Sequence, residues 1–202
     1  MYQPDSKPRG ATIMKSGIYH SIRTGILAIF TTLSLFITMH DQAHSQEQEL
    51  AVNFVAASDR LHTAGQPDAA HLSSLAGRGY ELVINIAPPA SKGAIATEGK
   101  LVAETGIAYV NIPVDWQHPQ YADFELFSGI LNQSGRRRVL IHCQVNMRAS
   151  LFTFLYRVVH EKADPREAYR FVTKVWEPQE QWLTFARQVL EKNNIKFEFT
   201  DK

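Results

Sequence analysis

Residues 136–150 read RRRVLIHCQVNMRAS, and they contain the only cysteine of the chain, Cys143. The run RVLIH (138–142) is apolar enough to form a strand of a sheet that is buried on both faces. A short turn, QVNM, follows the cysteine, and residues 149–161 have the pattern of a strongly apolar helix. The stretch therefore predicts a strand, a tight turn and a helix in direct succession, with Cys143 at the carboxyl end of the strand.

The rest of the chain repeats this alternation of strand and helix. Strands are predicted at residues 60–67, 81–86, 107–114 and 138–142, and helices at residues 68–79, 97–106, 121–135, 149–161, 164–176 and 178–193. Such an order indicates a mostly parallel sheet with helices packed on its faces. The expected fold class is α/β, with three layers and a mostly parallel central sheet flanked by helices.

Composition limits the domain number and the kind of partner. The chain has 202 residues, of which 45% are hydrophobic and 20% charged, and its net charge is +1. This length and composition favour one globular domain. A nearly neutral charge argues against a nucleic-acid partner, because domains that bind nucleic acid usually carry a clear basic excess. The oligomeric state is not readable from the sequence.

The N-terminal residues 1–45 have the pattern of a secretory signal peptide. Lys15 and Arg23 precede a mostly apolar run at 26–39, and small residues lead to a cleavage site at Ser45/Gln46. Residues 14–45 form the signal proper, because Met14 opens a better signal than Met1. The prediction is an exported protein, in a bacterial periplasm, with residues 46–202 as its domain. The alternative is an uncleaved membrane anchor at 26–39, although a spanning helix needs about 20 apolar residues.

Cys143 stands where a thiol becomes reactive. Ligands of open α/β sheets bind outside the carboxyl ends of the strands. There the backbone N–H groups of a turn and of a helix start form an anion site, which also stabilises a thiolate. Arg148 adds a planar guanidinium suited to a phosphate-type oxyanion. The predicted phosphate-binding residues are Gln144, Val145, Asn146, Met147, Arg148 and Ala149.

An apolar strand, His-Cys, a short loop, Arg and then Ser resemble the signature of cysteine-dependent protein tyrosine and dual-specificity phosphatases. The resemblance extends over most of residues 52–192, and NIPVDWQHPQ (111–120) is similar to the general-acid loop of these enzymes. TAGQP (63–67) and HCQVNMRAS (142–150) resemble a bacterial branch that also occurs fused to NAD-kinase-like domains. The resemblance implies a phosphocysteine intermediate, with no metal and no organic cofactor.

The same resemblance implies a role for each of five residues. Cys143 is the nucleophile and Arg148 the phosphate clamp, while Asp115 protonates the leaving oxygen and later activates water. Ser150 would hydrogen-bond the sulfur, and His142 would orient the loop from behind. Asp123 is the alternative general acid, although it falls inside a predicted helix.

The spacing of the loop leaves the reaction open. Four residues separate Cys143 from Arg148, whereas the usual phosphatase loop has five. A loop of this shorter length is also found in rhodanese-type sulfurtransferases, which carry a persulfide on the cysteine. Three functions therefore remain: hydrolysis of a phosphorylated protein or a small phosphomonoester, sulfur transfer through Cys143, and phosphate binding without catalysis. The scattered histidines and the single cysteine argue against a metal site.

Overall fold

The apolar runs of the sequence form one five-stranded sheet in the order β1-β2-β5-β3-β4. The computed structural model describes residues 50–199, all of which belong to one compact unit, residues 45–202. The strands are β1 (Val55–Ala56), β2 (Leu61–Ala64), β3 (Leu82–Asn85), β4 (Ala108–Asn111) and β5 (Val139–His142). Strands β2 to β5 run parallel, and only β1 is antiparallel to its neighbour β2.

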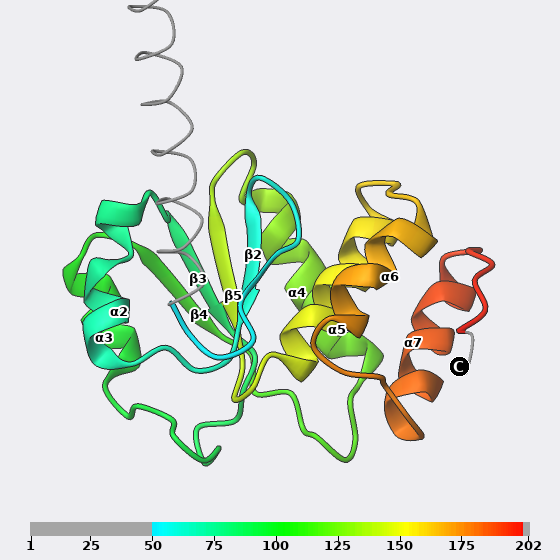
Figure 1. Ribbon diagram of the computed structural model, residues 1–202, viewed down its shortest axis with the longest axis horizontal. Coiled ribbons are helices and arrows are strands. Elements are labelled where there is room, and N and C mark those ends of the chain that lie inside the picture. The colour runs from blue at the N-terminus through cyan, green and yellow to red at the C-terminus, as the bar shows by residue number, and fades with distance from the viewer. Residues whose placement is uncertain (1–49, 200–202) are drawn as a thin grey trace, which may run out of the picture. The chain divides into compact units, whose positions relative to one another are not determined.

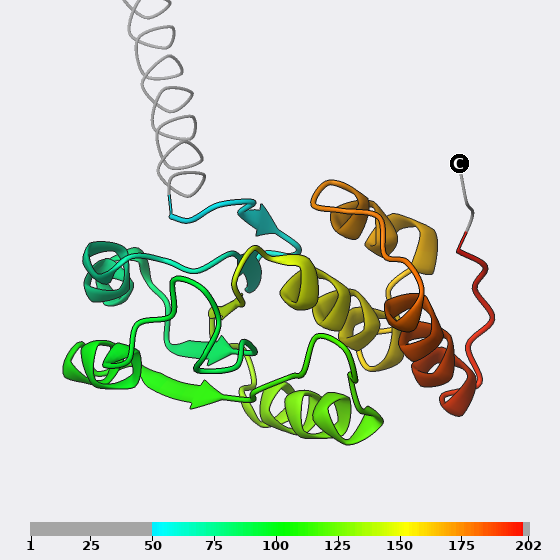
Figure 2. The same ribbon diagram turned by 90° about the horizontal axis from the view of Figure 1, so that it is seen from below.

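The helices cover both faces of this sheet (Figures 1 and 2). They are α2 (Ala69–Ser74), α3 (Glu98–Glu104), α4 (Tyr121–Gln133), α5 (Met147–Val159), α6 (Pro165–Thr173) and α7 (Gln181–Lys192), and a 3-10 turn, η1 (Ala76–Arg78), follows α2. Helices α2 and α3 lie on one face, and α4 and α5 lie on the other with α6 and α7 beyond them. The predicted α/β class, with a mostly parallel sheet between two layers of helices, is confirmed.

Strand β5 shows why the runs are continuously apolar. Val139 and Ile141 face the cluster built with α4 to α7, whereas Leu140 faces the cluster built with α2 and α3. All three side chains are fully buried, and each such burial stabilises the fold by about 1.5–3 kcal/mol. A strand between two hydrophobic clusters cannot alternate apolar with polar residues.

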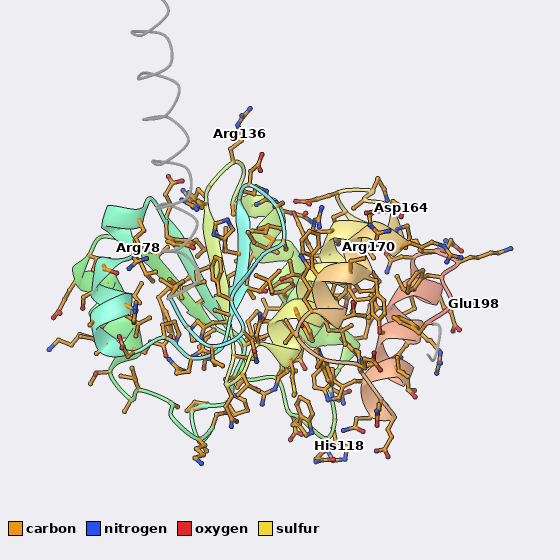
Figure 3. The ribbon with its side chains drawn as sticks, in the orientation of Figure 1. Arg78, His118, Arg136, Asp164, Arg170 and Glu198 are labelled. Carbon is orange, nitrogen blue, oxygen red and sulfur yellow. The ribbon has the colours of Figure 1, made fainter. Side chains whose placement is uncertain are left out.

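The register of the sheet brings the carboxyl ends of three strands level. His142, the last residue of β5, pairs with Ala64 at the end of β2 and with Asn85 at the end of β3. The residues that follow these strands, including Cys143, therefore leave the sheet on the same side, at the carboxyl ends of the strands. In Figure 3, Arg136, just before β5, marks the end of the sheet at which β5 begins. His118, after β4, projects in the opposite direction, from the end at which the parallel strands finish.

Several predicted boundaries shift. Helix α5 begins at Met147, two residues before the predicted start, so the turn after Cys143 is shorter than expected. Strand β4 ends at Asn111, before Pro113, which lacks the N–H that a strand interior needs. The predicted helix over 68–79 is split into α2 and η1, and Gly79 closes η1 in the left-handed conformation. The two-residue strand β1 was not predicted, because two residues give no period to recognise.

The predictions for residues 1–45 lie outside the residues that the structure describes. Among residues 50–199, none of the helices combines the length and the hydrophobicity needed to cross a membrane.

Candidate active site

Cys143 leaves the central strand of the sheet and enters the turn before α5. Its thiol is free and the residue is 1% exposed. Its backbone N–H donates to the carbonyl of Ala64 at 3.2 Å, so the ladder between β2 and β5 continues to the cysteine itself. The backbone of the nucleophile predicted from the sequence is therefore fixed by the central strand β5 and its neighbour β2.

The turn from Gln144 to Asn146 is held by the segment that follows β2. The backbone N–H of Gln66 donates to the carbonyl of Gln144 at 3.1 Å. Because a trans peptide group is planar, this bond directs the N–H of Val145 to the side opposite Gln66. The TAGQP segment, noticed in the sequence as part of a resemblance, thus orients a peptide group of the candidate phosphate loop.

A second segment, which we call the strap (residues 50–53), contacts the same turn. Asn53 donates from Nδ2 to the carbonyl of Val145 at 3.0 Å, and Asn146 donates from Nδ2 to the carbonyl of Asn53. Asn146 also donates to Oγ1 of Thr63 at 3.0 Å. The hydrogen bond from Asn53 keeps the carbonyl of Val145 turned toward the strap, and the two from Asn146 tie the end of the turn to the strap and to β2.

Asn146 makes the short turn before α5 possible. It precedes the first residue of α5 and has φ of 71°, in the left-handed region. Asparagine tolerates this region better than most residues. A single left-handed residue turns the chain from the strand end into the helix, which explains how the loop closes with one residue fewer than expected.

Arg148 lies in the first turn of α5 and is only 6% exposed. Its Nε and Nη1 atoms have no hydrogen-bond partner within the described part of the chain, and the guanidinium lies 5.6 Å from the ring centroid of Trp116. Burial lowers the pKa of Arg148, while the nearby Cys143 and Asp115 oppose this effect. A buried guanidinium with free donors is costly unless an anion completes it.

Cys143 and Arg148 line one cavity of about 320 Å³. Its other walls are Trp116, Gln144, Val145 and Met147. The backbone N–H groups of Met147, Arg148 and Ala149 belong to the first turn of α5, where no intrahelical acceptor is available to them. The structure thus brings all six predicted phosphate-binding residues into one turn and helix start beside the thiol.

The two candidate acids have different surroundings. Asp115 lies in the loop after β4, and its Oδ1 accepts the backbone N–H groups of Gln117 at 2.6 Å and His118 at 3.1 Å. Its charge acts on Arg148, which places it near the guanidinium. The carboxylate of Asp123 instead accepts the N–H of Gln120 at 3.1 Å and caps α4. Asp115 directly precedes Trp116, which lines the cavity, and it is the one of the two whose charge acts on Arg148.

Ser150 lies in α5, almost fully buried. Its hydroxyl donates to the carbonyl of Met147 at 3.0 Å, one turn earlier in the helix. The hydrogen bond to the Cys143 sulfur implied by the family resemblance requires this hydroxyl to turn, and it remains a prediction.

No family model matches the chain, and no curated protein matches its sequence. Two crystal structures of a phosphatase-like DUF442 protein of Shewanella putrefaciens CN-32 match it, with 33% and 32% sequence identity and TM-scores of 0.65 and 0.67. They cover 70% and 73% of this chain and 91% and 97% of the other.

The chain belongs to this DUF442 family of cysteine-phosphatase-like proteins. More distant structures share the fold. Tk-PTP is 16% identical with a TM-score of 0.60, covering 69% of this chain and 97% of its own. TpbA of P. aeruginosa is 18% identical with a TM-score of 0.53, covering 70% and 84%. The predicted relation to cysteine-dependent tyrosine phosphatases is confirmed, whereas the further likeness to domains fused with NAD-kinase-like proteins remains a prediction.

In the present chain, His142 makes a contact that sequence reasoning missed. Its Nε2 lies 2.6 Å from Oε1 of Glu98, and both side chains are buried. Nearby, burial and the charge of Glu98 raise the pKa of Tyr109 to about 12. In the sequence, TEGK (97–100) has the ordinary pattern of a helix start with an acidic first turn, so no local signal marks Glu98 as buried.

Three tryptophans connect the loop of Asp115 to α7, the last helix of the described chain. The ring of Trp116 lies 5.0 Å from that of Trp182 and 5.6 Å from that of Trp176, measured between centroids. Trp116 also lines the cavity. The packing of α7 therefore sets where the candidate acid loop stands relative to Arg148.

Proposed function

We propose that this protein is a cysteine-dependent phosphatase that hydrolyses a phosphomonoester through a phosphocysteine at Cys143. The observation that carries the proposal is the buried guanidinium of Arg148, whose free donors share a cavity with the only thiol of the chain. A tetrahedral oxyanion supplies acceptors for these donors and for the N–H groups of the first turn of α5. Membership of a phosphatase-like family supports the same chemistry.

The first half of the reaction is a transfer of the phosphoryl group to sulfur. The thiolate of Cys143 attacks phosphorus and forms an S–P bond, while the bond from phosphorus to the leaving oxygen breaks. That oxygen takes a proton from Asp115, so the product leaves as a neutral alcohol or phenol. Arg148 and the helix N–H groups hold the three remaining phosphoryl oxygens in place during the transfer.

Water completes the reaction. Asp115, now ionised, accepts a proton from a water molecule as its oxygen attacks phosphorus, and the S–P bond breaks to return the thiolate of Cys143. Inorganic phosphate is released and no electrons are exchanged, so the cycle needs no redox partner. Only one oxygen of Asp115 is committed to the turn at Gln117 and His118, which leaves Oδ2 for both proton transfers.

The structure supports a phosphorylated protein or a small phosphomonoester as the substrate. Among the distant relatives, TpbA has been crystallised with phosphotyrosine, and SIW14 of S. cerevisiae is named a PP-IP phosphatase. Trp116, Val145 and Met147 give the cavity apolar walls, which suits a substrate whose leaving group is organic.

We also propose that the protein is exported, because residues 14–45 have the pattern of a signal peptide. N-terminal sequencing of the secreted chain should give Gln46 as its first residue, and a chain retained in the cytoplasm would contradict the proposal.

The test compares the wild-type protein with three variants on p-nitrophenyl phosphate. Cys143→Ser should abolish turnover, and Asp115→Asn should lower kcat by about 100- to 10,000-fold because no acid protonates the leaving group. Asp123→Asn is the matched control, since it makes the same substitution in the first turn of α4, the next helix after Asp115, and should leave kcat nearly unchanged. Equal rates for the wild type and Cys143→Ser would refute the nucleophile, and a large loss only in Asp123→Asn would reverse the assignment of the acid.

Sulfur transfer is the second candidate, because the loop has four residues between Cys143 and Arg148. Mass spectrometry of the quenched enzyme separates the two reactions, since a phosphate and a persulfide on Cys143 differ in mass. Persulfide after incubation with thiosulfate, together with transfer to cyanide, would favour the sulfurtransferase. Phosphate binding without either adduct would favour a non-catalytic module.

A further inference from the structure

Glu98 is a buried carboxylate directly behind the candidate catalytic loop. It is the first residue of α3 and is 2% exposed, and it lies at the edge of the sheet where β2, β3 and β5 end. A buried charge is costly, and a protein keeps one only where donors surround it. No step of the reaction described above uses Glu98, so its position needs another explanation.

Three side-chain N–H groups contact this carboxylate, from the ends of β5 and β3 and from the segment after β2. Nε2 of His142 lies 2.6 Å from Oε1, and Nε2 of Gln66 donates to Oε2 at 2.8 Å. Nδ2 of Asn85 makes a longer contact to Oε2 at 3.4 Å. A single carboxylate thus connects β5, β3 and the segment after β2.

Two of the three residues that donate to Glu98 also hold the candidate catalytic loop. His142 precedes Cys143 in the chain, and the backbone N–H of Gln66 holds the carbonyl of Gln144 at 3.1 Å. Oε1 therefore fixes the residue before the nucleophile, and Oε2 fixes the residue that orients the next peptide group. Within the described residues, Nδ1 of His142 has no hydrogen-bond partner, so Glu98 makes the ring's single hydrogen bond.

We propose that Glu98 is a positioning residue, which holds the sulfur of Cys143 and the peptide groups of its loop in the geometry that binds the phosphoryl group. It acts through His142 and Gln66 and does not touch the substrate. The inference rests on the proposed phosphatase function for its kinetic readout, but a second readout below is independent of that function.

Kinetics give the first test, with Glu98→Gln and Gln66→Ala in the full-length chain. The amide of Glu98→Gln carries one oxygen, so only one side of the network can keep donating to it, and the His142 ring or the Gln66 amide must reverse its role or lose its hydrogen bond. We expect kcat on p-nitrophenyl phosphate to fall by about 10- to 100-fold, because small misplacements of reacting groups have effects of this size. KM should stay within about twofold, since the loss falls on the transition state. Gln66→Ala, on a half-buried turn, should give a smaller fall in kcat.

The matched control is Glu104→Gln, which makes the same substitution on an exposed residue of the same helix. Its kcat should equal that of the wild type. Urea unfolding of every variant gives the folded fraction under assay conditions. A fall in kcat that only follows the folded fraction, or an unchanged kcat in both Glu98→Gln and Gln66→Ala, would overturn the proposal.

Alkylation of the single cysteine gives the second test and needs no phosphatase activity. Iodoacetate is an anion and iodoacetamide is neutral, so the ratio of their rates measures how well the loop attracts an anion to the sulfur of Cys143. An intact cradle should favour iodoacetate, and inorganic phosphate should protect against it. Glu98→Gln should bring the ratio toward one.

The direction of that change distinguishes positioning from simple electrostatics. Removing a negative charge near the sulfur would by itself raise the preference for iodoacetate, so a higher ratio in Glu98→Gln would refute the positioning role. If the wild type fails to hydrolyse p-nitrophenyl phosphate, the proposed function fails, while the alkylation ratio still decides the role of Glu98.

Discussion

Arg148 is the residue at which function and stability conflict most directly. Its guanidinium is nearly fully buried beside Trp116, and two of its nitrogens have no partner in the described structure. A folded protein keeps such a group when a ligand completes it. Burial lowers the pKa of Arg148, and the nearby Cys143 and Asp115 offset only part of this effect.

Arg148→Met should therefore stabilise the empty protein while it abolishes turnover. An apolar side chain of similar length removes the buried charge, and we expect the free energy of unfolding to rise by about 1–2 kcal/mol. Urea titration in phosphate-free buffer measures it. Inorganic phosphate should then raise the melting temperature of the wild type but not of Arg148→Met. A variant that is less stable than the wild type without phosphate would show that the guanidinium is already satisfied.

At the scale of elements, the candidate phosphate-binding turn (residues 144–146) depends on the strap at residues 50–53, which is distant in the sequence. Gly65 is the point of closest approach, because a Cβ atom there would lie 2.3 Å from Cγ1 of Val52 and 3.0 Å from the carbonyl oxygen of Gln144. The backbone N–H of Gly65 also donates to the carbonyl of Val52 at 2.8 Å. Only glycine allows the strap to pack this closely against the turn.

Gly65→Ala should push the strap away and break the hydrogen bonds between Asn53 and the turn. We expect kcat/KM on p-nitrophenyl phosphate to fall by about tenfold or more, with unchanged secondary structure by circular dichroism. Gly129→Ala is the matched control, because nothing lies within 4 Å of a Cβ at this position in α4. The control should gain about 0.5–1 kcal/mol of stability and keep its activity. Full activity in Gly65→Ala would mean that the strap does not orient the turn.

Elements were more readable from the sequence than the contacts between them. The buried strands and the long helices α4, α5 and α7 follow from runs and periods that are local, and Asp164 with Pro165 marks the start of α6 by a local rule. The positions of Cys143 and Arg148 followed from the same logic, since strand, turn and helix adjoin in the chain. The contacts of Glu98 with His142 and of Asn53 with Val145 could not be predicted, because in each pair the partners are more than 40 residues apart in the chain.

At the scale of the whole molecule, the stability of the fold should depend on pH through His62. This residue of β2 is 2% exposed, and its Nδ1 lies 2.7 Å from the hydroxyl of Tyr80. Burial lowers the pKa of His62 from its ordinary value of 6.5 to about 4, while Asp59 and the backbone of Ser58 oppose the shift. Below pH 6.5 the unfolded chain takes up a proton that the folded chain resists until about pH 4.

The free energy of unfolding should therefore be highest above pH 6.5 and fall as the pH drops toward 4, by up to about 3 kcal/mol from this one group. Urea unfolding at pH 7.5 and pH 4.5 measures the fall in the wild type and in His62→Gln, which cannot titrate. The variant should lose less stability over this interval than the wild type. Equal losses in both proteins would assign the acid sensitivity to other groups.

The strand order has a consequence for how the site survives thermal fluctuation. Strand β5 has a parallel neighbour on each side, whereas β1 and β4 are the edges of the sheet. Edge strands open by local fraying, but the amides of a central strand exchange with solvent only when the whole domain unfolds. The peptide groups that lead to Cys143 should therefore be among the slowest in the protein to exchange hydrogen for deuterium. Reagents would then reach the sulfur through the 320 Å³ cavity rather than by partial unfolding, so the cavity selects what reacts there.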